Sequence, residues 1–303
     1  MATQPLAGTN AAWSLYRQCA ATSAFHKSRL ESLTKISLWL GIAGAVIATA
    51  SSALSLPPDA IQSKILGAVG SLCVALAGVA ATQAVAGNRD KIWVQCRGLG
   101  EALKSSVYMF CASVPPFDDA TRAVALSQRV ENALKDMSGL ELRADDGKKS
   151  APGPLTVDDY IKVRVDDQVT WYTQKAADFQ KKADFWRMCS FAGAALGAIM
   201  GVVSILYSLS PWVALLATAT ASITAFVKNQ RYASMIGLYQ ATAIRLRALK
   251  DQWLDSGKTD ADKAERASLI QRCEQTMSLE NGAWTAQWSQ QPDSPQTMTA
   301  KTP

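Results

Sequence analysis

The residues best suited to chemistry are few in this sequence, and their spacing does not bring them together. Asp166 and Asp167 are adjacent carboxylates, a pairing that metal binding or acid–base catalysis can use. We expect them on a helix, where neighbouring side chains point about 100° apart and therefore diverge. A solvated face, or ion pairs to another helix, is the favoured interpretation. His26 is the one histidine, which argues against a histidine-based metal site or a Ser-His-Asp triad within one chain.

The cysteines and the familiar sequence motifs add no catalytic site. None of the six cysteines forms a CxxC pair, and two lie inside apolar segments, so neither a disulfide framework nor a zinc site is predicted. No P-loop, GxGxxG, HExxH or GxSxG motif occurs. The sequence therefore predicts no catalytic residue, no metal and no cofactor, and we interpret the protein as something other than an enzyme.

Apolar residues are concentrated in four segments without a charged residue. The segments are residues 36–56, 65–86, 188–209 and 211–227. About 20 helical residues cross the roughly 30 Å core of a bilayer, and buried helices of soluble bundles usually keep a polar stripe that these lack. The sequence predicts an all-α integral membrane protein with four transmembrane helices in two hairpins and with long cytosolic helical extensions that form a bundle.

The basic residues beside these segments predict the orientation. Sixteen Lys and Arg residues lie within about 20 residues of the outer ends of the hairpins, whereas the two hairpin loops hold only Lys64. We expect a multi-pass protein of the inner membrane with both termini and the central region in the cytosol. The net charge of +6 is interpreted as orienting charge, and no long basic run indicates nucleic-acid binding.

Hydroxyl residues are the main polar groups inside the predicted spans, and two interpretations stay open for them. They can bond to carbonyl groups of their own helices, which costs little in lipid, or they can line a weakly polar pore. The candidate pore-lining residues, with Gln83 near the cytosolic mouth, are Thr49, Ser52, Ser55, Gln83, Thr218, Thr220, Ser222 and Thr224. No charged residue lies inside a span, which argues against a proton-coupled transporter, a voltage sensor or a charged selectivity ring.

Small residues recur every four positions in the last two spans and are typical of close helix packing. They can serve the hairpin itself or a contact between subunits. The candidate packing residues are Gly193, Gly197 and Gly201 in the third span and Ala217, Ala221 and Ala225 in the fourth. Outside the spans, a heptad stripe leads into the third one. Its candidate interface residues are Val165, Val169, Tyr172, Phe179 and Trp186.

The same order of elements occurs twice, which predicts a tandem repeat. We expect a first unit at residues 1–144, a linker at 145–154, a second unit at 155–288 and a disordered tail at 289–303. One segment resembles the helix that leads into the spans of SLATT domains. It consists of Arg164–Gln168, followed by Trp171, Tyr172, Lys175 and Ala176. The first half of the chain is similar to the same family. The similar residues there are Trp93, Arg97, Glu101, Leu103 and Lys104, then Pro115–Phe117.

The resemblance implies a two-span membrane effector, present twice, of the kind associated with nucleotide signalling in bacterial conflict or defence systems. It implies pore formation and a trigger supplied by a partner protein or a small molecule. Our first hypothesis is a pore-forming or channel-like homo-oligomer in the lipid bilayer, because four weakly polar spans hardly enclose water within one monomer. The alternative is a non-conducting scaffold whose cytosolic helices recruit partners.

Overall fold

The computed structural model describes residues 5–53, 61–145, 147, 150–207 and 209–289, and within these ranges it contains helices and no β-strand. The chain divides into two compact units, each assembled from segments distant in the sequence. The polar unit comprises Met1–His26, Asp90–Tyr172 and Ala241–Pro303, and the span unit comprises Lys27–Arg89 and Thr173–Gln240. Each unit draws on both halves of the predicted tandem repeat, whose boundaries stay a prediction.

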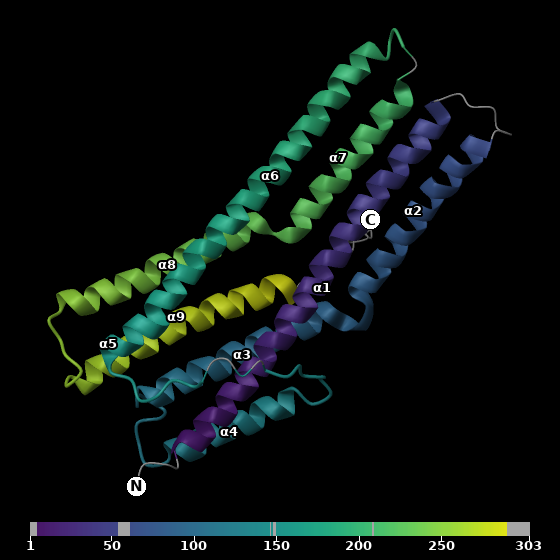
Figure 1. Cartoon of the computed structure of the whole chain (residues 1–303). Helices are drawn as coiled ribbons and strands as arrows, with labels where there is room; N and C mark the ends of the chain where they lie inside the picture. Colours follow the sequence, from purple (N-terminus) through teal and green to yellow (C-terminus); the bar gives the residue numbers. More distant parts are fainter. Residues whose placement is uncertain (1–4, 54–60, 146, 148–149, 208, 290–303) are drawn as a thin grey trace, which may run out of the picture. The chain divides into compact units, whose positions relative to one another are not determined.

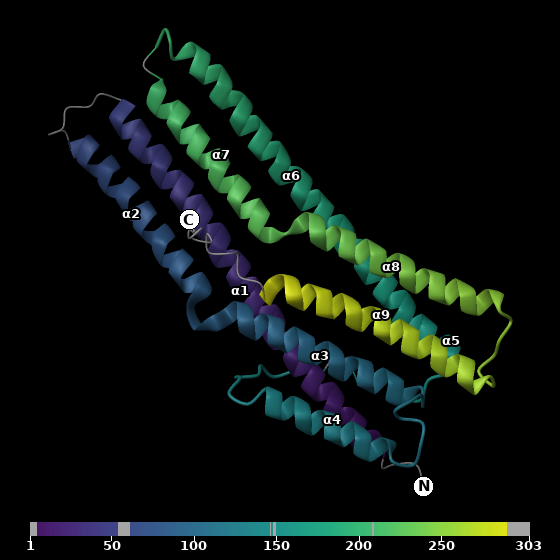
Figure 2. The same ribbon diagram turned by 180° about the vertical axis from the view of Figure 1, so that it is seen from behind.

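Two helical hairpins build the span unit. Their helices are α1 (Pro5–Ala53), α2 (Ile61–Val85), α6 (Asp167–Val203) and α7 (Ser210–Gln230). Both views show α1 beside α2 and α6 beside α7 (Figures 1 and 2). Among the described residues, four helical stretches are long and apolar enough to cross a membrane. The predicted fold class, an all-α protein with four membrane-spanning helices, is confirmed.

Trp186 is the centre of an aromatic cluster that connects the two hairpins of the span unit. Its side chain is 7% exposed and packs with Phe226 and Tyr232, while Leu38 of α1 is packed against the same cluster. The Trp39 ring of α1 lies 6.2 Å from the Trp186 ring, centroid to centroid. Burial of such large rings makes this contact a strong stabilising element of the unit.

The second helix of each hairpin is interrupted, whereas the first is not. Gly87 (φ 69°) and Asn88 (φ 51°) separate α2 from α3 (Arg89–Cys111), and Arg231 (φ 51°) separates α7 from α8 (Tyr232–Asp255). A left-handed backbone is disfavoured for residues with a side chain, so Asn88 and Arg231 mark real breaks. α1 and α6 carry no such break. The two hairpins therefore share one plan: a continuous first helix and a bent second one.

The polar unit packs α3, α8, α4 (Arg122–Asp136) and α9 (Lys263–Ser289) with the first turns of α1. One buried cluster joins three of these helices: it consists of Leu15, Cys19, Cys96, Leu103, Ala133 and Met137. The predicted linker is attached to the same unit, because Arg17 Nε lies 3.0 Å from the Asp145 carboxylate and the Pro152 carbonyl accepts from the Cys111 thiol at 3.2 Å.

The helix leading into the third span contains a π-helical segment. It starts at a capping box, in which the Thr156 hydroxyl accepts from the Asp159 amide at 3.2 Å and the Asp159 carboxylate accepts from the Thr156 amide at 3.3 Å. α5 (Val157–Tyr160) follows, then the π-helix η2 (Ile161–Asp166), then α6. Val165, Val169 and Tyr172 of the predicted stripe are buried in the polar unit. Single π turns often occur at functional sites.

The structure bears on two of the predicted boundaries. The helix of the third predicted span, α6, ends at Val203, and hydrogen-bonded turns at residues 204–207 follow, so the last residues of the predicted span 188–209 are not helical, while the span bounds themselves stay a prediction. The Ser204 hydroxyl donates to the Gly201 carbonyl at 2.7 Å, an alternative to helix bonding that such residues offer. Ser55, part of the first loop and nearly all of the predicted tail lie outside the described residues.

Candidate functional site

The hydroxyl groups of α7 are bonded within their own helix. The Thr218 hydroxyl donates to the Ala214 carbonyl at 2.9 Å, the Ser222 hydroxyl to the Thr218 carbonyl at 2.9 Å, and the Thr224 hydroxyl to the Thr220 carbonyl at 2.8 Å. Such bonds satisfy the one donor of each hydroxyl and leave its oxygen able to accept from water or another helix.

The exposed face of α7 consists of small residues. Between Ala214 and Val227, the exposed residues are Ala214, Ala217, Thr218, Ala221, Thr224 and Ala225. The bulky apolar residues of α7 point elsewhere, since Leu215 and Phe226 are buried. The neighbouring helix α6 has the opposite pattern, because its exposed residues include Met188, Phe191 and Ile199. The face of α7 is therefore suited to the close approach of another helix.

The glycine ridge of α6 contacts α7 at a different face. A Cβ atom on Gly193 would lie 2.5 Å from the Thr220 hydroxyl oxygen, and one on Gly197 would lie 3.8 Å from the Leu216 Cβ atom. A Cβ atom on Gly201 would meet nothing within 4 Å. Gly193 thus admits Thr220 to the hairpin interior, while the predicted alanine partners stay exposed.

The remaining candidate pore residues belong to the first hairpin. Ser52 is exposed and its hydroxyl donates to the Thr49 carbonyl at 2.9 Å. Gln83 is also exposed, and its main-chain carbonyl accepts from Arg89 Nε at 3.3 Å. The Ser52 bond stays within one helix, as do the hydroxyl bonds of α7. A pore-lining role for these residues and for those of α7 stays a proposal.

A close contact in the first hairpin was missed by the sequence reasoning. A Cβ atom on Gly44 would lie 2.8 Å from Val74 Cγ2 and 3.0 Å from the Gly70 carbonyl oxygen, and one on Gly70 would lie 3.4 Å from the Gly44 carbonyl oxygen. The two backbones meet at this pair of glycines. A glycine near the middle of each of two consecutive spans was the signal available in the sequence.

A buried ionic cluster lies in the polar unit between η2 and α9. Arg164 donates from Nε and Nη2 to both carboxylate oxygens of Glu274 at 2.9 Å, and the Tyr160 hydroxyl donates to the same carboxylate at 2.9 Å. The three side chains are almost inaccessible, with Arg164 1% exposed. The Arg164 guanidinium also lies 4.8 Å from the Tyr108 ring centroid. A bidentate pair of this kind is among the strongest polar contacts.

A second cluster repeats this chemistry further along α9. Glu280, which is 4% exposed, accepts from the Tyr172 hydroxyl at 2.9 Å and from Arg97 Nη2 at 3.4 Å. The Arg97 guanidinium lies 4.4 Å from the Trp284 ring. Glu274 and Glu280 thus each meet one arginine and one tyrosine, which compensates for the cost of burying their charges.

Burial and these neighbours shift the protonation equilibria of the polar unit. Burial alone would lower the pKa of Arg164, but the Glu274 carboxylate outweighs it and raises that pKa well above its usual value. Burial raises the pKa of Glu280. Burial would also raise the pKa of Glu101, yet Lys104 and Arg164 lower it. Burial, with Arg164 nearby, lowers the pKa of Lys104 to about 8. Glu101 is therefore an anion at neutral pH.

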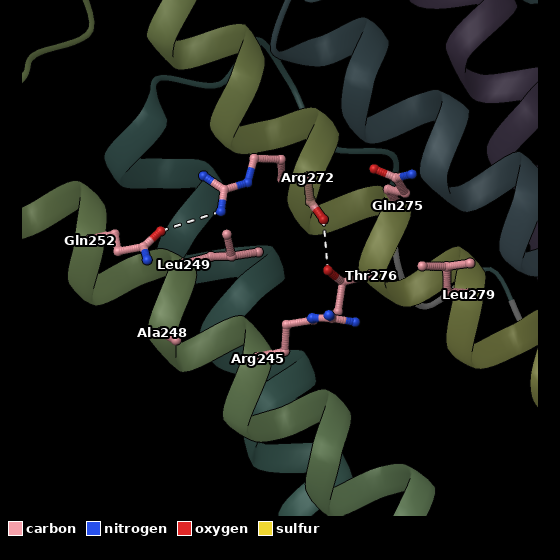
Figure 3. Close-up of a pocket in the computed structure, with 8 residues that line it drawn as sticks. All are labelled: Arg245, Ala248, Leu249, Gln252, Arg272, Gln275, Thr276 and Leu279. Atoms are coloured by element: carbon pink, nitrogen blue, oxygen red, sulfur yellow. Dashed lines mark hydrogen bonds between the residues drawn. The ribbon is translucent and has the colours of Figure 1, made fainter.

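A more open groove lies between α8 and α9, with a volume of about 460 Å³ (Figure 3). The exposed side chains of Arg245 and Arg272 reach into it from the two helices, and Arg272 Nη2 donates to Gln252 Oε1 at 3.4 Å. Among the residues that the structure describes, no group of three or more His, Cys, Asp or Glu side chains could hold a metal ion.

Two domain matches cover most of the chain. Residues 14–167 match the SMODS and SLOG-associating 2TM effector domain 3, SLATT_3, and residues 160–284 match the corresponding domain 1, SLATT_1. The protein belongs to the SLATT family. Two domains of two spans each agree with the four candidate spans, so this SLATT protein is a multi-pass membrane protein of the effector type. No curated protein and no solved structure matches the chain.

Several residues that carried the resemblance to SLATT domains lie in the ionic clusters. Arg97 pairs with Glu280 and Arg164 with Glu274, while Asp166 pairs with Lys250 Nζ at 2.6 Å. The ion pair agrees with the favoured interpretation of Asp166. Glu274 and Glu280 themselves were missed. They are carboxylates among the buried apolar residues of α9, such as Cys273 and Met277. A charged residue at an otherwise apolar position of a helix was the signal in the sequence that could have pointed to a buried ion pair.

Proposed function

We propose that this SLATT protein is a pore-forming or channel-like membrane effector that acts as a homo-oligomer in a bacterial conflict or defence system. The observation that carries the proposal is the exposed face of α7, where Ala217, Thr218, Ala221, Thr224 and Ala225 stand in place of bulky apolar residues. Small residues allow helices of neighbouring copies to approach closely. Threonine oxygens accept hydrogen bonds from water, so the same face can border a pore.

The proposed orientation has both termini and the polar unit in the cytosol and the hairpin loops outside the inner membrane. It is supported by the sixteen basic residues beside the outer ends of the hairpins, against Lys64 in the loops. A pore lined by hydroxyl and methyl groups has no fixed charge, and we expect it to select weakly among ions. The polar unit would then receive the trigger, from a partner protein or a small molecule.

The alternative is a non-conducting scaffold that recruits partners. It is favoured by one observation: the hydroxyls of Thr218, Ser222 and Thr224 already donate to carbonyls of α7. A helix with satisfied donors needs no water, so this face can also lie against lipid.

Dye and ion flux from liposomes containing the purified protein separates the two functions. In the pore proposal, wild-type liposomes leak, and the double change Thr218→Val and Thr224→Val reduces the leak while the fold persists. Thr220→Val is the matched control, because Thr220 packs on Gly193 inside the hairpin. If the liposomes do not leak at any ratio of protein to lipid, even when bacterial extract is added as the source of the trigger, the scaffold is favoured.

A further inference from the structure

The positive charge of the protein is concentrated in the span unit. Its two segments, Lys27–Arg89 and Thr173–Gln240, hold eleven Lys and Arg residues against four Asp and Glu residues. The segments of the polar unit hold twenty Lys and Arg residues against twenty-one Asp and Glu residues. The polar unit is therefore almost neutral, and the net charge of +6 belongs to the unit that contains the candidate spans.

Two of these cations lie at the contact between α1 and α6. Within the span unit the two helices run in the same direction (Figures 1 and 2), and the rings of Trp39 and Trp186 lie 6.2 Å apart. Lys35 lies four residues before Trp39 on α1. Lys182 lies four residues before Trp186 on α6. Residues four apart are neighbours on one side of a helix, so the two lysines lie at one level, a helical turn before the paired rings.

A third cation comes to the same place through the Phe179 ring. The Lys182 ammonium lies 5.7 Å from the centroid of this ring, and the Lys27 ammonium of α1 lies 6.0 Å from it. The contact between α1 and α6 thus brings ammonium groups from both helices to one aromatic ring. Like charges repel, so this arrangement favours an anion near the contact.

The acidic residues beside these lysines do not supply that anion. Glu31 pairs within α1 at 3.8 Å, and Asp178 and Asp184 pair within α6 at 4.0 Å and 3.3 Å. Lys35 and Lys182 are exposed, and neither makes an ion pair with a described residue. Two cations from different helices therefore remain open to an anion from outside the chain.

Exposed apolar side chains adjoin the same lysines. On α1 these are Ile36 and Trp39, of which Trp39 is 52% exposed, and on α6 they are Phe185 and Met188. Both helices contain candidate spans, so exposed apolar side chains at the start of a span meet the bilayer. A molecule that fits both features has an anionic group beside the ammonium groups and hydrocarbon beside the apolar side chains.

We propose that an anionic phospholipid binds at the contact between α1 and α6. Its phosphate lies between the ammonium groups of Lys35 and Lys182, and its acyl chains lie along Trp39 and the neighbouring apolar residues. A zwitterionic phospholipid fits less well, because its own cation is repelled by the lysines. Since α1 and α6 belong to different hairpins, the bound lipid bridges the two hairpins and stabilises the span unit. The binding does not depend on whether the protein conducts.

Native mass spectrometry of the full chain, released from detergent, tests the binding. The probes are phosphatidylglycerol and phosphatidylcholine with identical acyl chains, added singly at matched concentrations. Each Lys or Arg near an anionic lipid surface contributes about fivefold to binding. We therefore expect phosphatidylglycerol to bind more than about tenfold tighter than phosphatidylcholine. Glycerol phosphate, which has the anionic group without acyl chains, should not displace the bound lipid.

Variants locate the bound lipid. The double change Lys35→Gln and Lys182→Gln should lower the preference for phosphatidylglycerol by about tenfold or more. Its thermal midpoint in lipid-free detergent should equal that of wild type, because both side chains are exposed. Lys35→Arg with Lys182→Arg keeps the charges and should keep the preference. Lys64→Gln is the matched control: it removes an exposed cation beside a span at the hairpin loops, and it should bind like wild type.

Equal binding of the two phospholipids to the wild-type chain would overturn the inference. So would an undiminished preference in the double glutamine variant, or an equal loss in Lys64→Gln, which would reduce the effect to general surface charge. Displacement of the lipid by glycerol phosphate would show a site for a free phosphate group instead. None of these measurements uses flux, so the lipid site and the pore proposal fail or succeed in separate experiments.

Discussion

In the polar unit, charged groups are buried and paired, whereas in α7 of the span unit the hydroxyls of Thr218, Ser222 and Thr224 donate to carbonyls of their own helix. Glu274 and Glu280 each depend on side chains from other helices. Thr218 and Thr224 depend on nothing outside α7. The polar unit is thereby fixed in one arrangement of its helices, while α7 keeps its bonds in any arrangement. In the proposed function, the polar unit receives the trigger and the spans rearrange, and this difference between the two units is suited to those roles.

The largest expected effect is in the polar unit. Glu274→Ala leaves the Arg164 guanidinium buried and unpaired, and removal of one partner from such a pair costs about 3–5 kcal/mol of folding free energy. Thermal unfolding in detergent measures the loss. The double change Arg164→Met with Glu274→Leu should recover most of it, because an apolar pair of similar volume replaces the ions. Thr218→Val in α7 should stay within about 0.5 kcal/mol. Equal effects of Glu274→Ala and Thr218→Val would contradict the comparison.

Alkaline pH should destabilise the polar unit next. Burial raises the pKa of Cys19 and Cys273 to about 12 and that of Cys96 and Cys111 to about 11, against about 8.5 in an unfolded chain. Between those values the native state binds more protons than the unfolded state, so stability present below about pH 8.5 is lost as pH rises. Lys104, with its pKa lowered to about 8, makes stability rise with pH, but it is a single group and the buried thiols are four.

The thermal midpoint between about pH 8 and 11, the window of the unfolded and native thiol pKa values, measures this loss. Cys19→Ala should make the fall with pH shallower. A midpoint that stays level across the window would show that the thiols are not held protonated by burial.

A smaller effect is expected at the glycine pair of the first hairpin. Gly44→Ala places a methyl group 2.8 Å from Val74 Cγ2 and 3.0 Å from the Gly70 carbonyl oxygen, and overpacking of this kind costs roughly 1–3 kcal/mol. Gly41→Ala is the matched control, because its methyl group would meet nothing within 4 Å. Detergent unfolding of both variants checks this. Equal stability of Gly44→Ala and Gly41→Ala would mean that the two helices of the hairpin move apart with little loss of folding free energy.

The fold was largely predictable because the length of uncharged apolar segments determines where a chain can cross a bilayer. The helical stripe through Val165, Val169 and Tyr172 was predictable for a similar local reason, since burial follows the heptad spacing. The α9 glutamates were not predictable, because their pairing depends on the register of α9 against η2, which no local pattern specifies. Likewise, the π turn and the outward direction of the α7 alanines depend on packing between helices.

The most direct test of the account is cross-linking between copies at the α7 face in native membranes. Ala221→Cys places a thiol on the exposed small-residue face, and Ile199→Cys places one on the exposed bulky face of α6. With a short bis-maleimide, the oligomeric pore should give covalent dimers and larger species from Ala221→Cys, and only the background of the parent chain from Ile199→Cys. Cross-linking no stronger at Ala221→Cys than at Ile199→Cys would show that α7 faces lipid, and the proposal of an oligomeric pore would then be wrong.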